Sequence, residues 1–86
     1  MASYDLRIKP SAAKELEGTD SKKDRQKIVE RIATLAKDPR PPGSLKLTGR
    51  EGYRVRHGSY RILYEIDDEK SILTIFKIAH RRGVYR

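Results

Sequence analysis

The sequence predicts an α+β domain in which two helices pack on one face of a four-stranded, mainly antiparallel sheet. Three observations support this class. Apolar residues alternate with polar ones near the N-terminus and across the C-terminal half, which is typical of strands. Between these regions the apolar residues recur at helical spacing. At 86 residues, the chain has room for one domain, covering residues 1–86, and one modest core.

The N-terminal part is predicted to contain a strand followed by a short helix. Over residues 4–8 apolar and charged residues alternate, as in a half-buried strand. A proline follows directly, and it can both end the strand and start a helix over residues 11–17. We expect Leu16 to be the main inward-facing side chain of this helix.

A second helix is predicted to follow Ser21 and to end at about Lys37. Asp24 stands three residues after Ser21, as in a capping box, and a proline two residues beyond Lys37 stops the helix. The opposite, charged face includes Arg31, and we expect it to be solvated and without function. The apolar stripe consists of residues at helical spacing, namely Ile28, Ile32 and Leu35, widened by Val29, Ala33 and Ala36.

The C-terminal half is predicted to consist of a loop and three strands. Residues 39–52 are rich in proline and glycine, and we expect this loop to lie against the core in extended form. The last strand is apolar on both faces, which predicts strands on both sides of it. The three strands cover residues 53–57, 60–66 and 71–79.

A two-residue turn at Gly58-Ser59 fixes the pairing of the first two of these strands. Since side chains alternate across a sheet, arginines 54, 56 and 61 then share one face, opposite the face that meets the helices. The predicted pairs are His57 with Tyr60, Arg56 with Arg61, Val55 with Ile62, and Tyr53 with Tyr64.

Arginines 56 and 61 thus face each other directly. Like charges at such positions destabilise a sheet by about 0.2–1 kcal/mol, so stability alone does not account for the pair. An anionic ligand between the guanidinium groups would account for it. The alternative is that both groups extend into water or pair with carboxylates such as Glu65.

The net charge of +8 is unevenly distributed. Residues 1–39 carry nine Lys/Arg against seven Asp/Glu, whereas residues 40–86 carry eleven against five. The absence of cysteine excludes disulfides and cysteine-based zinc sites, and the two histidines show no metal-binding spacing. No segment looks like a signal peptide or a membrane span, so we expect a cytoplasmic protein without a membrane partner.

Arginine and tyrosine are interleaved in YRVRHGSYRILY, residues 53–64, and again in HRRGVYR, residues 80–86. Guanidinium groups bind phosphate, and tyrosine rings stack on bases, so the two segments together indicate a protein that handles RNA or DNA. The second segment follows the last predicted strand directly. Strand ends are suitable places to present side chains to a substrate.

These two segments resemble the RelE/ParE superfamily of bacterial toxins, and within it the RelE-type mRNA interferases. The resemblance covers almost the whole chain, and the predicted order of elements is the one this family uses. It implies a ribonuclease that needs no metal or cofactor and cuts mRNA in the ribosomal A site. The 2′-hydroxyl would attack the adjacent phosphate, leaving a 2′,3′-cyclic phosphate and a 5′-hydroxyl.

The resemblance also implies roles for individual residues. Arg61 would hold the phosphate and stabilise its developing charge. Arg81 would lie by the leaving 5′-oxygen as a proton donor or electrostatic stabiliser, and Tyr85 would stack on or orient the target nucleotide. Arginines 54, 56, 82 and 86 would bind RNA.

The chain departs from the family pattern at Arg54 and Arg56, where the best-known members have lysines, one of them thought to help deprotonate the 2′-hydroxyl. Arginine is a poor general base because its pKa lies above about 12. Either catalysis relies on electrostatics and in-line positioning, or a histidine takes the proton. His80 adjoins Arg81 and is the better candidate, whereas His57 is expected to flank the turn and stack on Tyr60.

Two alternative functions remain open from the sequence. One is a ParE-like inhibitor of DNA gyrase, which would share the fold but not the chemistry, and the other is a non-catalytic RNA-binding module. The resemblance further implies a cognate RelB-like antitoxin as partner, with an acidic amphipathic segment, besides the ribosome and mRNA. Operator DNA would be bound only through the antitoxin.

Overall fold

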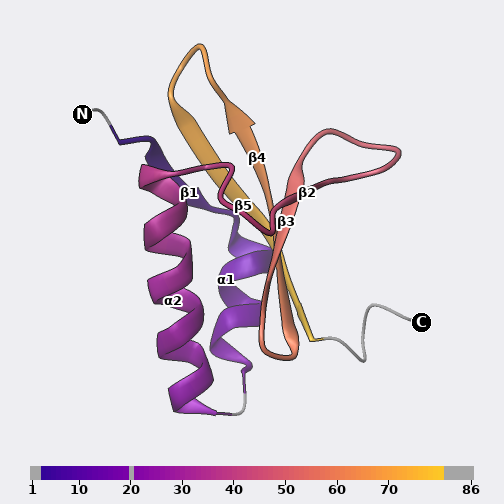
Figure 1. Cartoon of the computed structure of the whole chain (residues 1–86). Coiled ribbons are helices and arrows are strands. Elements are labelled where there is room, and N and C mark those ends of the chain that lie inside the picture. Colours follow the sequence, from indigo (N-terminus) through magenta and orange to yellow (C-terminus); the bar gives the residue numbers. More distant parts are fainter. Residues whose placement is uncertain (1–2, 20, 81–86) are drawn as a thin grey trace.

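The computed structural model describes residues 3–19 and 21–80 of the chain. Both helices lie on the same side of a single twisted sheet (Figure 1). The elements are β1 (Asp5–Ile8), α1 (Pro10–Glu17), α2 (Lys22–Lys37), β2 (Leu45–Lys46), β3 (Tyr53–His57), β4 (Tyr60–Asp67) and β5 (Ile72–His80).

The strand order across the sheet is β1-β5-β4-β3-β2, with β1 parallel to β5 and all other neighbours antiparallel. The predicted α+β class is confirmed. The sheet has one strand more than the four expected, because the extended segment of the loop pairs Leu45 with Arg54 and Lys46 with Tyr53. As expected, β5 has a strand on either side.

The hairpin of β3 and β4 has the predicted register, including Arg56 opposite Arg61 and Val55 opposite Ile62. Gly58 in the turn has a φ of +58°, a left-handed conformation that favours glycine. This turn and the end of β5 lie at the same end of the sheet (Figure 1). The turn between β4 and β5 lies at the other end.

The core lies between the helices and the sheet. Fully or almost fully buried residues of α2 pack there against the sheet, and the predicted inward stripe of Ile28, Ile32 and Leu35 is confirmed. The predicted widening of that stripe was wrong for Val29, which is 50% exposed, and for Ala33, which is also exposed. The sheet contributes Val55, Ile62, Tyr64, Leu73, Ile75 and Ile78.

The residues at the start of each helix determine where that helix begins. Pro10 is the first residue of α1, and Ser21 Oγ accepts a hydrogen bond of 3.2 Å from the Asp24 amide at the start of α2. Leu16 packs at the edge of the core, but the fully buried residue of α1 is Ala12. A small side chain there lets the short helix approach the sheet closely.

Tyr64 fixes the path of the chain that follows α2. Its ring is fully buried, and its hydroxyl donates a 2.6 Å hydrogen bond to the carbonyl of Pro39. Burial raises the pKa of Tyr64 to about 12. Gly52 passes so close to this residue that a Cβ there would lie 2.8 Å from the Tyr64 carbonyl oxygen. These contacts hold the loop that carries β2 against the sheet.

The end of β5 extends past β1, which pairs only with Ile72 to Ile75. Glu15 of α1 takes the place of the missing strand. One of its carboxylate oxygens accepts the Ile78 amide at 2.9 Å, and the other lies 3.2 Å from Lys77 Nζ. The strand that leads to Arg81 is therefore anchored on this edge by a side chain.

None of the helices in the described ranges is long and apolar enough to cross a membrane.

Candidate functional site

The face of the sheet that the helices do not cover carries the predicted arginine cluster. Arg56 and Arg61 are direct cross-strand partners, and Arg54 lies two residues from Arg56 on the same strand, so all three project to this face. Arg61 is only 8% exposed, although it is charged. Its cross-strand partner on the other side is Ala79 of β5, which is also buried.

A hollow of about 460 Å³ lies at the β3 edge of the sheet. One of the residues that line it is Arg31, which was expected to be solvated and without function. Arg31 reaches it from α2 and lies with Arg54 and Arg56 around Gly43 and Leu45. No local signal distinguishes Arg31 from the other charged residues of its helix. Its inclusion depends on the loop after α2, which brings the β3 edge beside it.

The three arginines of this hollow share a second property. Within residues 3–19 and 21–80, no carboxylate or other hydrogen-bond acceptor lies within bonding distance of the guanidinium groups of Arg31, Arg54 and Arg56. Arg31 and Arg54 are half-buried and Arg56 is exposed. Arginines without carboxylate partners that line one hollow generate a positive potential, which attracts anions.

Arginines elsewhere in the described chain have partners. Arg7 pairs with Asp5 at 3.1 Å, Arg40 with Asp68 at 2.9 Å, and Arg50 with Glu65 at 2.8 Å. Glu65, which the sequence offered as a possible partner of Arg56 or Arg61, thus pairs with Arg50. Arg25 donates instead to the Thr19 carbonyl at 3.2 Å.

The end of the sheet at the β4–β5 turn is acidic. Asp67, Asp68 and Glu69 lie there, and with Glu51 and Glu65 they line a shallow depression. Hydrogen bonds from Arg40 and then from Tyr4 lower the pKa of the Asp68 carboxyl, which keeps it ionised. Carboxylates are thus concentrated at this end, where Arg40 and Arg50 pair with two of them.

The structure places His80 away from the arginine face. Its cross-strand partner is Tyr60, and the two rings meet edge to face with centroids 5.0 Å apart. Tyr60 packs against the core, so its cross-strand partner His80 lies on the helix side, and alternation puts Arg61 on the other face. The expected stacking of His57 on Tyr60 is replaced by this contact with His80.

Tyr53 and Tyr64 form the cross-strand pair that the hairpin register predicts, and both pack in or against the core. Tyr53 and Tyr64 stack with centroids 6.0 Å apart on the helix side. The Arg40 guanidinium lies over the Tyr53 ring, 5.2 Å from its centroid. Four predicted site residues, Arg81, Arg82, Tyr85 and Arg86, lie outside the described residues.

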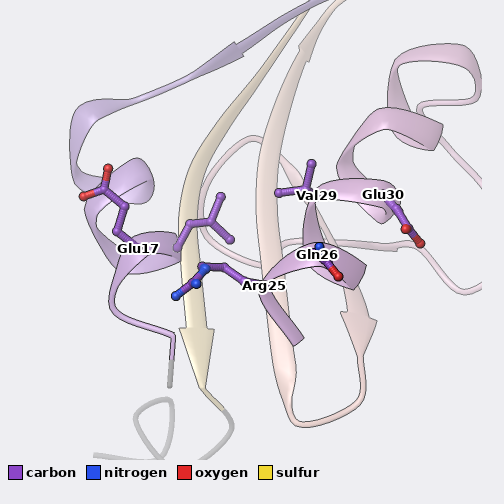
Figure 2. A pocket seen from close by; sticks show the side chains of 6 residues that line it. Glu17, Arg25, Gln26, Val29 and Glu30 are labelled. Atoms are coloured by element: carbon purple, nitrogen blue, oxygen red, sulfur yellow. The ribbon is translucent and has the colours of Figure 1, made fainter. Parts of the chain in front are cut away.

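A second hollow lies on the opposite side of the molecule from the arginine face, between α1 and α2. Leu16 and Val29 form its apolar floor, and Glu17 and Arg25 stand at its rim. Figure 2 shows Arg25 extending from α2 toward α1. Val29 is one of the few large apolar side chains left exposed in the described chain.

Among the residues that the structure describes, no group of three or more His, Cys, Asp or Glu side chains is arranged to hold a metal ion.

Comparison with known proteins assigns the family. The model of the ParE toxin family of type II toxin–antitoxin systems matches residues 6–85. The chain belongs to this family. It is therefore a toxin of a type II toxin–antitoxin system, within the RelE/ParE superfamily that the sequence resembles.

A curated relative, toxin RelG of Mycobacterium tuberculosis, is 44% identical over 34 residues. That match spans 40% of this chain and 39% of the relative, so the chain aligns with about two-fifths of the relative's length.

Solved structures match over nearly the whole chain. The toxin–antitoxin complex RelBE2 of Mycobacterium tuberculosis has a TM-score of 0.80 at 29% identity and covers 94% of both chains. The archaeal RelE–RelB complex of Pyrococcus horikoshii has a TM-score of 0.78 at 26% identity and covers 92% of this toxin and 96% of its counterpart. The RelBE complex of Escherichia coli, at 23% identity and a TM-score of 0.78, has the same fold.

Proposed function

We propose that this toxin is an endoribonuclease that cleaves mRNA in the ribosomal A site and so stops translation. The observation that carries the proposal is the position of Arg61. This charged side chain is almost buried on the open face of the sheet, directly opposite Arg56, whose guanidinium has no partner in the described chain. A phosphate above this pair would contact both guanidinium groups, and it would remove the repulsion between them.

The reaction that suits such a site is attack of a ribose 2′-hydroxyl on the adjacent phosphorus. The new P–O2′ bond forms as the P–O5′ bond breaks, giving a 2′,3′-cyclic phosphate and a 5′-hydroxyl. Negative charge increases on the phosphoryl oxygens in the transition state, and Arg61 would stabilise it there. Arg81 follows β5 directly and would assist the leaving 5′-oxygen, while Tyr85 would orient the nucleotide.

The proton of the 2′-hydroxyl needs an acceptor. Arg54 and Arg56 would act through the permanent positive charge of the guanidinium group, which favours the alkoxide of the attacking oxygen. The packing of His80 on Tyr60, on the helix side of the sheet, argues against His80 as the base. We therefore favour catalysis by electrostatics and in-line positioning, with the proton passing to water.

We propose a cognate RelB-like antitoxin as the partner of this toxin. Type II systems pair a toxin with an antitoxin, and the solved relatives include RelB complexes. An acidic amphipathic segment suits a chain of net charge +8. Its apolar side would occupy the hollow between α1 and α2, where Val29 and Leu16 are accessible. Operator DNA would be bound through the antitoxin.

The antitoxin site is tested by Val29→Asp, with Val29→Thr as the matched control of similar shape. The aspartate should weaken the complex at least tenfold in a titration, because it buries an unpaired charge in an apolar contact. The threonine should have a smaller effect. Unchanged affinity of both variants would rule out this hollow as the docking site.

Inhibition of DNA gyrase is the second candidate, and the match to the ParE family model favours it. Arg54 and Arg56, which have no partner among the described residues, lie beside Arg61 and favour the nuclease, because a gyrase inhibitor does not require a phosphate-cleavage site.

Primer extension on ribosome-bound mRNA separates the two candidates. Addition of the purified toxin should give new ends within the A-site codon, and Arg61→Ala and Arg81→Ala should abolish them. Supercoiling by purified gyrase should be unaffected. Loss of supercoiling, or gyrase-dependent DNA breaks without mRNA cuts, would reject the nuclease and support the alternative.

A further inference from the structure

We propose that Arg31, Arg54 and Arg56 form a second phosphate site at the β3 edge, which holds a backbone phosphate next to the scissile one. Arg31 of α2 is the new member of this site. The proposal rests on the RNA-cleaving function above and extends it, since it adds a substrate-positioning residue that takes no part in bond breaking.

The hollow itself has the chemistry of an anion site. Its five lining residues comprise three arginines, a glycine and a leucine, and no carboxylate is among them. A Cβ at Gly43 would meet no atom within 4 Å, so the backbone here leaves the space open. Leu45, which is 53% exposed, offers an apolar surface for a ribose or a base beside the charged groups.

The distribution of ion pairs singles out the same three residues. Arg7, Arg40 and Arg50 each bind a carboxylate within 3.1 Å, and Arg25 donates to a carbonyl. The guanidinium groups of Arg31, Arg54 and Arg56 have no partner among residues 3–19 and 21–80, although they come from two elements that are far apart in the sequence. Three positive groups around one hollow repel one another, and a bound anion removes that cost.

Arg61 does not line the hollow, but Arg56 lines it and faces Arg61 across the hairpin. Arg61 lies on β4, while Arg54 and Arg56 lie on β3, one strand nearer the edge, and Arg31 lies beyond them on α2. Adjacent strands are about 4.8 Å apart. An extended nucleic-acid strand that crosses β4 and β3 can therefore place one phosphate at Arg61 and the next one over the hollow, with Arg56 between them.

An acidic antitoxin segment could also bind arginines. We favour the RNA backbone because Arg56 links the hollow to Arg61 on the same face, and because the apolar antitoxin hollow lies between the helices, on the other side of the sheet.

The test measures binding apart from cleavage. The probe is a fluorescent oligouridylate with 2′-O-methyl riboses, which cannot undergo 2′-hydroxyl attack, and its anisotropy is followed over a range of salt concentrations. Arg31→Ala should weaken binding roughly tenfold at low salt and lower the slope of log K against log salt by about 0.7, the contribution of one phosphate contact on a single strand. Arg31→Lys should keep the slope and lose part of the affinity, because it retains the charge but not the forked geometry.

Arg25→Ala is the matched control, since it removes the same charge from the same helix at a position away from the hollow. It should leave the affinity and slope close to those of the wild type. Thermal unfolding of each variant checks that the domain stays folded, and Arg54→Ala, which should behave like Arg31→Ala, provides a second substitution in the hollow.

If Arg31→Ala, Arg54→Ala and Arg25→Ala have equal effects, the second phosphate site is rejected. It is also rejected if Arg31→Ala weakens only the binding of an acidic antitoxin peptide. The toxin could fail to cut ribosome-bound mRNA while Arg31→Ala still weakens oligouridylate binding. That result would reject the nuclease proposal and support the phosphate site.

Discussion

Arginines near the two ends of the sheet differ in whether they have carboxylate partners. At the end formed by the β4–β5 turn, Arg40 binds Asp68 and Arg50 binds Glu65. Toward the β3–β4 turn, Arg56 and Arg31 have no partner in the described chain, and Arg56 stands directly opposite Arg61. The difference lies in the position of the carboxylates, which accompany Arg40 and Arg50 but not Arg31 and Arg56 among the described residues.

The two groups of arginines therefore have different roles, one in stability and the other in binding an anion. Arginines that bind carboxylates contribute to the fold and present little net charge to a ligand. Arginines without carboxylates weaken the fold by mutual repulsion and keep their charge for an anion. We call the end with Arg40 and Arg50 the paired end, and the region of Arg31, Arg54 and Arg56 the unpaired end.

The largest effect is expected when an alanine substitution near the β3–β4 turn is compared with one at the paired end. Arg61→Ala should lower mRNA cleavage about 10²- to 10³-fold, the usual loss when one group that stabilises transition-state charge is removed. Arg50→Ala should leave cleavage within about twofold, because Glu65 already neutralises this arginine. Primer extension gives both rates, and circular dichroism confirms folding. Comparable losses from both substitutions would show that the two ends do not differ in function.

The second prediction concerns a substitution that gives the arginines of the unpaired end a carboxylate partner. Leu45 is the cross-strand neighbour of Arg54, so Leu45→Glu should bring a carboxylate to the arginines of the hollow. Affinity for the 2′-O-methyl oligouridylate should fall about tenfold or more, because the new carboxylate competes with phosphate. Leu45→Gln is the uncharged control and should have a small effect. If both variants bind RNA equally, the charge of the hollow does not determine affinity.

The third prediction concerns stability and has opposite signs at the two ends. Arg56→Thr should raise the free energy of unfolding by about 0.5 kcal/mol, because it removes the repulsion with Arg61 and introduces a residue that favours strands. Arg40→Ala should lower it by up to about 1 kcal/mol, because the Asp68 pair and the contact with the Tyr53 ring are lost. Urea unfolding measures both. A loss of stability in Arg56→Thr would contradict the repulsion argument.

The smallest effect is a pH dependence at the paired end. Since Arg40 and Tyr4 lower the pKa of Asp68 in the folded state, its ionised form stabilises the fold above about pH 4, and that stability is lost as the pH falls through the folded-state pKa. Asp68→Asn should melt at a lower temperature than the wild type at neutral pH. The difference should shrink as the pH falls below 4. A constant difference across this range would show that ionisation of Asp68 does not contribute.

Most of the fold could be predicted because its determinants are local. Helical spacing located Ile28, Ile32 and Leu35, and the two-residue turn fixed the register that sets Arg56 against Arg61. One error concerned exposure. Val29 has the right spacing for the core, but the short α1 leaves it uncovered.

The sequence by itself determined that Arg54, Arg56 and Arg61 share one face of β3 and β4, because alternation along a strand and a tight hairpin leave only one arrangement of neighbouring side chains. Only the tertiary structure decided that Arg31 joins Arg54 and Arg56, that Asp68 meets Arg40, and that Glu15 secures the edge of β5. These contacts join residues far apart in the chain. They depend on how helices, loop and sheet pack together, and no spacing within one segment encodes that packing.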